Sequence, residues 1–456
     1  MLDDNTIEVP RDIGPDLRTA IAAGDAERIS ALLEPLPYSE ALRELLALSP
    51  EERDDVLKLV PAELAADLIE EAPDEMAAEL VERLEPERAA EILEELDSDV
   101  QADVIGEMDA ADAEAVLCEM DAEDAADVRR LAAYEYDTAG GLMMAEVFQF
   151  ADKDTVGKVL RALASDDDDF EQYRGQHPYI VNEAGEPIGV VSLRSLLTAR
   201  RSAQLTEVMV APITVPVDMP LAQLEDIFER HPFLGIPVID AAGVLVGVVS
   251  RSAVAEAVLE RSESESLKRQ GVVGDELRSM PTWLRSRRRL AWLSANIILN
   301  IVAASVISVY EDTLSAVIAL AVFLPMVSDM SGCSGNQAVG VTMRELSLGL
   351  VRPVDAFPVW LKEISVGVIN GIALGVLIGV VAWVWKDNPA LGLVIGAALA
   401  LNTLLAVSIG GVVPLLLKRL GQDPAAASGP LLTTVTDMAG FFFVLSFATL
   451  MMPWLV

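Results

Sequence analysis

The pattern of apolar and polar positions changes along the chain, and its first part predicts short helices. Residues 59–128 repeat with a period near twelve, and each repeat places apolar residues at roughly i, i+4 and i+7 after an opening Pro, Asp or Ser. Pro61, Pro73 and Pro86 suit the first turn of a helix, and Asp109 suits an N-cap. We therefore predict an all-α superhelix whose neighbouring repeats bury one another.

The next pattern is a duplicated one. "PYIVNEAGEPIGVVSLRSLL" (178–197) and "IPVIDAAGVLVGVVSRSAV" (236–254) each predict a β-branched strand, an acidic–Gly turn, a second strand and a helix. With an amphipathic helix ahead of each copy, residues 141–258 resemble an α+β tandem pair of CBS domains, a regulatory module. The Asp with which adenosine-binding copies hold the ribose is replaced by Ser195 and Ala253, so we do not expect nucleotide binding.

Long apolar runs follow a polar stretch at 259–284 and a basic cluster at Arg285–Arg289. Each run approaches the ~20 residues that cross the hydrocarbon layer as a helix. The basic residues after this cluster lie between the second and third runs or after the fourth, with Lys386 as the one exception. The opposite loops carry Glu311, Asp312 and Asp387. The positive-inside rule therefore predicts a cytoplasmic N-terminus and an outside C-terminus. We place five spans at 290–310, 314–340, 357–385, 390–417 and 424–453.

Composition separates an acidic half from a membrane half. The chain has a formal net charge of −39, and residues 1–140 hold 41 acidic against 10 basic residues. Such a surface excludes nucleic acid as a partner, because a phosphate backbone needs cations. The first thirty residues show no secretory signal. Two cysteines and two histidines without a CxxC motif predict neither a disulfide framework nor a zinc site.

The membrane half carries polar residues in two of its spans. Gly367 to Gly379, four apart in the third span, form a small-xxx-small face for close helix packing. In the second span, Asp329, Gly332 and Asn336 belong to one polar stripe, which must face protein or water because facing lipid is costly.

Asp437 lies in the otherwise apolar fifth span, on one helical face with Gly429 and Thr433. A carboxylate at mid-membrane costs several kcal/mol unless it is partnered or hydrated, and the spans hold no basic residue near it, so an ion-pathway role is the default hypothesis. Carboxylate, amide, hydroxyl and carbonyl oxygens suit a hard cation such as Mg²⁺, Ca²⁺ or Mn²⁺. Cys333 is the one soft ligand nearby.

Four motifs carry a resemblance to a known family. They are "YDTAGGLM" (136–143), "RRRLAWL" (287–293), "FLPM…SGNQA" (323–338) and "DPAAASGPLLTTVTD" (423–437). With the order of the domains, they make the whole chain similar to the MgtE family of bacterial Mg²⁺ transporters and channels. Departures from the family pattern lie at Ser331–Gly332–Cys333 and at Asp329.

This resemblance implies a homodimer with its pore between subunits, Asp437 as the key cation-binding residue, and gating by intracellular Mg²⁺ through the N and CBS domains. Mg²⁺ would then be both the transported ion and a regulatory ligand. The resemblance also places the chain in the bacterial inner membrane. Within the pore we expect Asp437, Asp329, Asn336, Gly332, Thr433 and Gly429 to contact the ion. The candidate Mg²⁺ sensor residues are Glu256, Glu260, Glu263 and Glu265.

The expected function is therefore a Mg²⁺-selective channel or transporter driven by the membrane potential, and not an enzyme. A permease for Co²⁺, Mn²⁺ or Ca²⁺ is the alternative within the class. A membrane metalloprotease would need an HExxH motif, which the sequence lacks, and a membrane-anchored nucleotide sensor would not need five spans. The expected organisation is an acidic helical-repeat N-domain (1–136), CBS domain 1 (137–200), CBS domain 2 (201–258), a connecting plug helix (259–284) and a five-helix pore domain (285–456).

Overall fold

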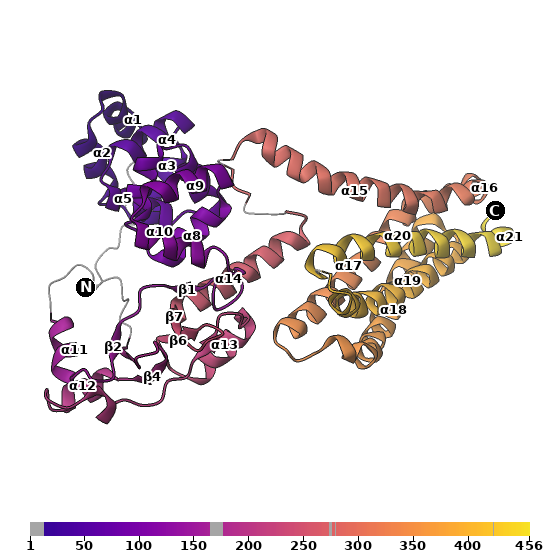
Figure 1. Ribbon diagram of the computed structural model, residues 1–456. Coiled ribbons are helices and arrows are strands. Elements are labelled where there is room, and N and C mark those ends of the chain that lie inside the picture. Colours follow the sequence, from indigo (N-terminus) through magenta and orange to yellow (C-terminus); the bar gives the residue numbers. More distant parts are fainter. Residues whose placement is uncertain (1–12, 165–176, 273–275, 279, 423) are drawn as a thin grey trace, which may run out of the picture. The chain divides into compact units, whose positions relative to one another are not determined.

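The chain forms two compact units, Met1–Arg261 and Ser262–Val456 (Figure 1). The first contains a stack of short helices followed by two small sheets with their helices. The second contains long helices. The computed structural model describes residues 13–164, 177–272, 276–278, 280–422 and 424–456.

The helical repeat predicted in the N-terminal part is confirmed. Helices α5 to α10 begin at residues 62, 74, 86, 98, 110 and 122, so each begins twelve residues after the one before it. Helices α5 to α8 each contact the next helix but one along the stack, which buries the apolar stripe of each against a neighbouring repeat. The helices are α1 (Gly14–Ala23), α2 (Ala26–Leu33), α3 (Tyr38–Leu46), α4 (Pro50–Leu59), α5 (Ala62–Glu70), α6 (Asp74–Glu82), α7 (Pro86–Leu93), α8 (Ser98–Glu107), α9 (Ala110–Glu119) and α10 (Ala122–Leu131).

The starts of these helices differ slightly from the prediction. Pro86 is in the first turn as predicted, whereas Pro61 and Pro73 occupy the N-cap position one residue earlier. Asp109 is the predicted N-cap of α9, but its side chain makes no capping bond. Instead its backbone N–H donates to Glu82 Oε1 at 2.6 Å, so the end of α6 fixes the start of α9.

Two sheets of matching design follow the helical stack, as the duplicated sequence pattern predicts. In each sheet, one strand pairs in parallel with the first strand of an antiparallel hairpin: β2 with the β3–β4 hairpin, and β5 with the β6–β7 hairpin. The strand orders are β2-β3-β4 and β1-β7-β6-β5. Gly185 and Gly243 occupy the two hairpin turns with φ of 81° and 86°, where a side chain would be strained. The elements are β1 (Met143–Met144), β2 (Gln149–Ala151), α11 (Val156–Ala162), β3 (Tyr179–Val181), β4 (Pro187–Val190), α12 (Leu193–Thr198), η2 (Leu205–Glu207), β5 (Val215–Pro216), α13 (Leu221–Arg230), β6 (Gly235–Ile239) and β7 (Leu245–Ser250).

The first part of the predicted connecting helix, 259–269, belongs to a helix that begins earlier, and residues 273–275 and 279 of that prediction lie outside the described residues. Helix α14 already begins at Arg251, directly after β7, and ends at Arg269. Gly271 terminates it with a φ of 77°, and its neighbour Val272 donates a backbone hydrogen bond to Leu267. The basic cluster lies inside the first turns of the next helix, α15, and not in a loop before it.

The second unit contains long helices at the positions of the five predicted spans. Four described helical segments are long and apolar enough to cross a membrane: Thr282–Val309, Pro353–Lys386, Pro389–Arg419 and Gly429–Leu450. Helix α17 at the predicted second span is as long as α15 but is not among these four segments. The helices are α15 (Thr282–Val309), α16 (Glu311–Ala316), α17 (Leu320–Ser347), η3 (Pro353–Asp355), α18 (Ala356–Lys386), α19 (Pro389–Arg419), α20 (Pro424–Leu450) and α21 (Met452–Leu455).

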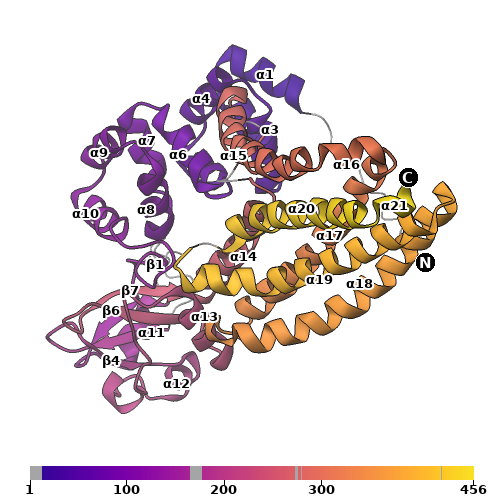
Figure 2. The same ribbon diagram turned by 90° about the vertical axis from the view of Figure 1, so that its right-hand side faces the viewer.

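Helix α19 is the centre of this bundle and contacts α17, α18 and α20, which run beside it in both views (Figures 1 and 2). The predicted glycine face of α18 packs on α19. A Cβ atom added to Gly375 would lie 2.6 Å from the carbonyl oxygen of Gly396, so the helices approach at a distance that only glycine permits. This packing leaves the opposite sides of α19 free to hold α17 and α20, which carry the polar residues.

Candidate functional site

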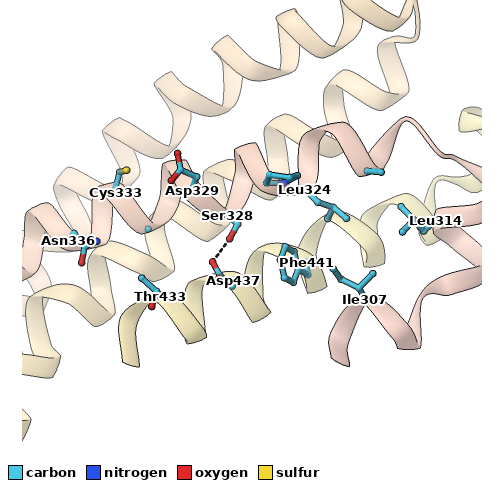
Figure 3. A pocket seen from close by; sticks show the side chains of 13 residues that line it. Ile307, Leu314, Leu324, Ser328, Asp329, Cys333, Asn336, Thr433, Asp437 and Phe441 are labelled. Atoms are coloured by element: carbon cyan, nitrogen blue, oxygen red, sulfur yellow. Dashed lines mark hydrogen bonds between the residues drawn. The ribbon is translucent and has the colours of Figure 1, made fainter. Parts of the chain in front are cut away.

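A cavity of about 630 Å³ lies beside α17 and α20 (Figure 3). Figure 3 shows its polar side chains gathered at one end and its apolar side chains at the other. The apolar end includes Ile307, Leu314 and Phe441, so α15 and α16 also contribute to the wall. The cavity is therefore a partly open space on the membrane unit (Ser262–Val456), with hydrogen-bonding groups at one end.

Asp437 is the acidic residue of α20 that lines this space. Its side chain is partly buried, and Oδ1 accepts a hydrogen bond from the hydroxyl of Ser328 on α17. Figure 3 shows the two side chains pointing toward one another between the helices. Among the described residues the carboxylate thus has one hydrogen-bond donor, Ser328, and its partly open side leaves room for a cation.

Helix α17 supplies most of the other polar groups. Asp329, Cys333 and Asn336 are spaced by four and three residues, which places them on one helical face toward the cavity. All three are exposed in the single chain. Gly332, on the same stripe, is buried, and its missing side chain leaves the helix backbone beside Thr436 of α20. The stripe predicted from the sequence therefore borders one cavity with Asp437.

The structure brings most of the predicted pore residues together. Gly429 is the exception: it does not line the cavity, although its carbonyl oxygen accepts a hydrogen bond of 3.1 Å from Thr433 Oγ1. The predicted residues that do line the cavity are Asp437, Asp329, Asn336, Gly332 and Thr433.

One buried residue near this site escaped prediction from the sequence. Asn402 of α19 is fully buried, and its amide donates to the hydroxyl of Ser331 on α17 and to the carbonyl oxygen of Thr436 on α20. The signal was a single amide in the apolar run "LALNTLLAV", since polar residues inside a membrane helix usually pair across helices. The sequence did not indicate which helices the amide joins.

The four candidate sensor residues lie along α14 but face different surroundings. Glu256 and Glu263 are exposed, and Glu265 is partly buried. Glu260 is the one that contacts the end of the helical repeat, where it accepts a hydrogen bond from the hydroxyl of Tyr136. The structure does not gather the four into one group.

A group of carboxylates surrounds this contact. Burial, followed by the charges of Asp74, Asp99 and Glu260, raises the pKa of Asp103 on α8 from 3.8 to about 8. Burial and the hydrogen bond to Glu260 raise the pKa of Tyr136 as well. Negative charges from the helical repeat and from α14 therefore repel one another at this place, and a cation would relieve the repulsion.

The chemistry of the membrane cavity is that of oxygen ligands for a hard cation. Two carboxylates, an amide and two hydroxyls border it, together with one thiol. Mg²⁺ keeps several of its waters and is typically bound through one or two carboxylates, so a roomy site with few direct ligands fits a hydrated Mg²⁺ ion.

Comparison with known families gives matches along most of the chain. The model for the family MgtE, described as a divalent cation transporter, matches residues 324–447. The model for the MgtE intracellular N domain matches 36–137, and the CBS domain model matches 139–202 and 205–260. These regions contain the helical stack, the two sheets and the helices that border the cavity.

Individual relatives agree with these matches. The magnesium transporter MgtE of Thermus thermophilus is 34% identical over 335 residues, which cover 72% of this chain and 73% of the relative. The magnesium transporter MgtE of Bacillus subtilis (strain 168) is 29% identical over 323 residues, 71% of each chain.

Among solved structures, the cytosolic domain of the Mg²⁺ channel MgtE in complex with ATP is similar, with a TM-score of 0.49 and 31% identity over 54% of this chain and 99% of that chain. ATP is bound to that protein, and the expectation that the CBS pair here does not bind nucleotide stays a prediction.

Proposed function

The chain belongs to the MgtE family of magnesium transporters, and on this premise we propose that it is a Mg²⁺-selective channel or transporter whose ions pass beside Asp437. One observation carries the proposal: the carboxylates of Asp437 and Asp329, on two different helices, border one cavity inside the membrane unit. Thr433 and Asn336 add neutral oxygens for the water shell of the ion. Gly429 would act through its bond to Thr433.

The driving force in this proposal is the membrane potential. An inside-negative potential favours entry by about 2.3 kcal/mol per charge per 100 mV, or about 4.6 kcal/mol for a divalent ion. The ion therefore needs no coupling to a chemical reaction, and no residue is assigned a catalytic role.

The functional unit in this proposal is a homodimer in the bacterial inner membrane, with cytoplasmic N and CBS domains and an outside C-terminus. Asp329, Cys333 and Asn336 support it, because they are exposed in the single chain and such groups do not face lipid. A second copy that covers this side would close the cavity into a pore and bring a second Asp437 to it.

Gating is assigned to intracellular Mg²⁺ bound between the helical repeat and α14. Asp103 and Glu260 support this, since burial and the charges of neighbouring carboxylates, Glu260 among them, raise the pKa of Asp103 where the two parts contact. At low Mg²⁺ the repulsion separates them, and bound Mg²⁺ bridges them and biases the pore toward its closed state. The segment 259–284 would carry this change to α15 as the plug of the pore, with Arg285–Arg289 at the inner membrane surface.

The test is Mg²⁺ uptake into proteoliposomes under an imposed potential. We expect Asp437→Ala to abolish uptake, because the pore would lose the charge that compensates ion dehydration. Asp312→Ala is the matched control: this acid is exposed on α16, does not line the cavity, and its removal should leave uptake unchanged. Undiminished uptake in Asp437→Ala would contradict the proposal.

Transport of other divalent cations is the second candidate, and Cys333 in the cavity wall favours it. A thiol is a softer ligand than the oxygens around it and binds Co²⁺ more readily than Mg²⁺. Competition of Mg²⁺ uptake by Co²⁺, Mn²⁺ or Ca²⁺ separates the two functions. Stronger transport of one of these ions than of Mg²⁺, at equal concentration, would favour the second.

A further inference from the structure

A single buried amide joins the two helices that carry the candidate pore residues. Asn402 lies on α19, does not line the cavity, and is fully buried. Its Nδ2 atom donates to Ser331 Oγ on α17 and, over 3.0 Å, to the carbonyl oxygen of Thr436 on α20. Both partners are fully buried as well. These bonds are thus shielded from water and connect three helices.

The two partners of Asn402 stand next to the residues that face the ion pathway. Thr436 immediately precedes Asp437 in α20. The Ser331 hydroxyl donates to the carbonyl oxygen of Ser328 over 2.9 Å, and Ser328 in turn donates to the Asp437 carboxylate. The amide therefore contacts α17 and α20 at the level where the helices meet through the Ser328–Asp437 hydrogen bond.

The surrounding backbone is shaped to admit this side chain. A Cβ atom added to Gly440, one turn after Thr436, would lie 2.8 Å from Nδ2 of Asn402. The side-chain oxygen of Asn402, Oδ1, is buried and has no hydrogen-bond partner among the described residues. A leucine of similar size would avoid this unpaired oxygen but would supply no donor. The contribution of the side chain is therefore its NH₂ group.

We infer that Asn402 is a positioning residue for cation selectivity: by bonding to α17 and α20 together, it sets the distance between the Ser328 and Asp437 backbones and so the width of the pathway beside the carboxylate. The inference rests on the proposed role of Asp437. Asn402 itself does not line the cavity, so it acts through its two partners and not by touching the ion.

A fixed distance matters because Mg²⁺ and larger divalent ions differ in how rigidly they hold water. Mg²⁺ demands near-octahedral geometry and dehydrates reluctantly, whereas Ca²⁺ accepts irregular shells of six to eight oxygens. A pathway of constant width accepts the hydrated Mg²⁺ complex and disfavours an ion that must rearrange its shell. When the amide is lost, α17 and α20 can separate, and discrimination against Ca²⁺ should fall.

The experiment compares Asn402→Ala with Thr403→Val in proteoliposomes. Thr403 is the next residue of α19, is equally buried, and has a hydroxyl without a partner among the described residues, so its replacement controls for altered packing. We expect Asn402→Ala to raise the Mg²⁺ concentration for half-maximal uptake by about five- to tenfold, the factor for one or two lost hydrogen bonds. The Mg²⁺/Ca²⁺ uptake ratio should fall, while Thr403→Val keeps both values.

Ser331→Ala is the milder variant if Asn402→Ala does not fold, because it removes one of the two acceptors and should produce a smaller change of the same kind. An unchanged Mg²⁺/Ca²⁺ ratio in a folded Asn402 or Ser331 variant, with only the maximal rate lowered, would overturn the inference. The proposed function fails separately: normal uptake by Asp437→Ala would remove the pore assignment, whatever the Asn402 variants do.

Discussion

The thiol of Cys333 lies within the same cavity as Asp329, one helical turn further along α17. It is exposed in the chain and has no disulfide partner among the described residues. The only other cysteine, Cys118, lies on α9 of the other unit. A single native thiol can therefore report on access to the proposed pathway.

We predict that a cationic, water-soluble methanethiosulfonate reagent applied to Cys118→Ser protein will lower Mg²⁺ uptake several-fold. The added positive group would stand near Asp329 and Asp437, where it repels the ion and narrows its path. Excess Mg²⁺ should slow the modification. Cys333→Ser in the same background should transport normally and be insensitive to the reagent. Full uptake by protein in which Cys333 is shown by mass to be modified would place the pathway elsewhere.

At the scale of elements, the contact between α18 and α19 makes the sharpest steric prediction. We expect Gly375→Ala to destabilise the membrane unit by about 1–3 kcal/mol, because its Cβ would lie 2.6 Å from the carbonyl oxygen of Gly396. Thermal unfolding in detergent should show a midpoint lowered by several degrees. Gly340→Ala on α17 is the matched control, since a Cβ there meets nothing within 4 Å. An equal midpoint for both variants would contradict this packing.

The elements themselves followed from periodicity because each is defined by local spacing. The twelve-residue repeat predicted helices α5 to α10, and the duplicated strand pattern predicted the paired sheets. Contacts between distant residues did not follow. The bonds of Asn402 to Ser331 and Thr436 depend on how α17, α19 and α20 pack, and no spacing within one helix encodes that arrangement.

The same limit applies to the sensor residues. Four glutamates on α14 look alike in the sequence, and only the fold shows that Glu260 reaches Tyr136. Likewise, Asp103 is one of many acids in the N-terminal repeats, and its burial beside α14 distinguishes it only after α8 is placed. The acidic composition shows that the N-terminal part is rich in carboxylates, whereas the packing of the helices decides which of them lie near α14.

At the scale of the whole molecule, the proposed gating requires the soluble domains to influence the pore. Asp103 is the group whose chemistry is best suited to begin that influence, because its pKa of about 8 lies far above the ordinary 3.8. Between about pH 4 and 8, Asp103 is therefore protonated while α8 contacts α14 and ionised when the two helices separate. The contact between α8 and α14 becomes weaker as the pH rises toward 8, because the Asp103 carboxylate then ionises among other negative charges.

This linkage predicts how protons and Mg²⁺ act on transport. At low Mg²⁺ on the domain side, lowering the pH there from 8 to 6 should reduce uptake, because protonated Asp103 permits the closed contact without a bridging cation. Asp103→Asn should show low uptake at both pH values and a shallower inhibition by Mg²⁺, since the neutral amide removes the repulsion that Mg²⁺ otherwise overcomes. Glu256→Gln, an exposed change on α14, should behave like the unaltered protein. If Asp103→Asn keeps the same pH response and the same Mg²⁺ inhibition as the unaltered protein, the α8–α14 contact does not control the pore.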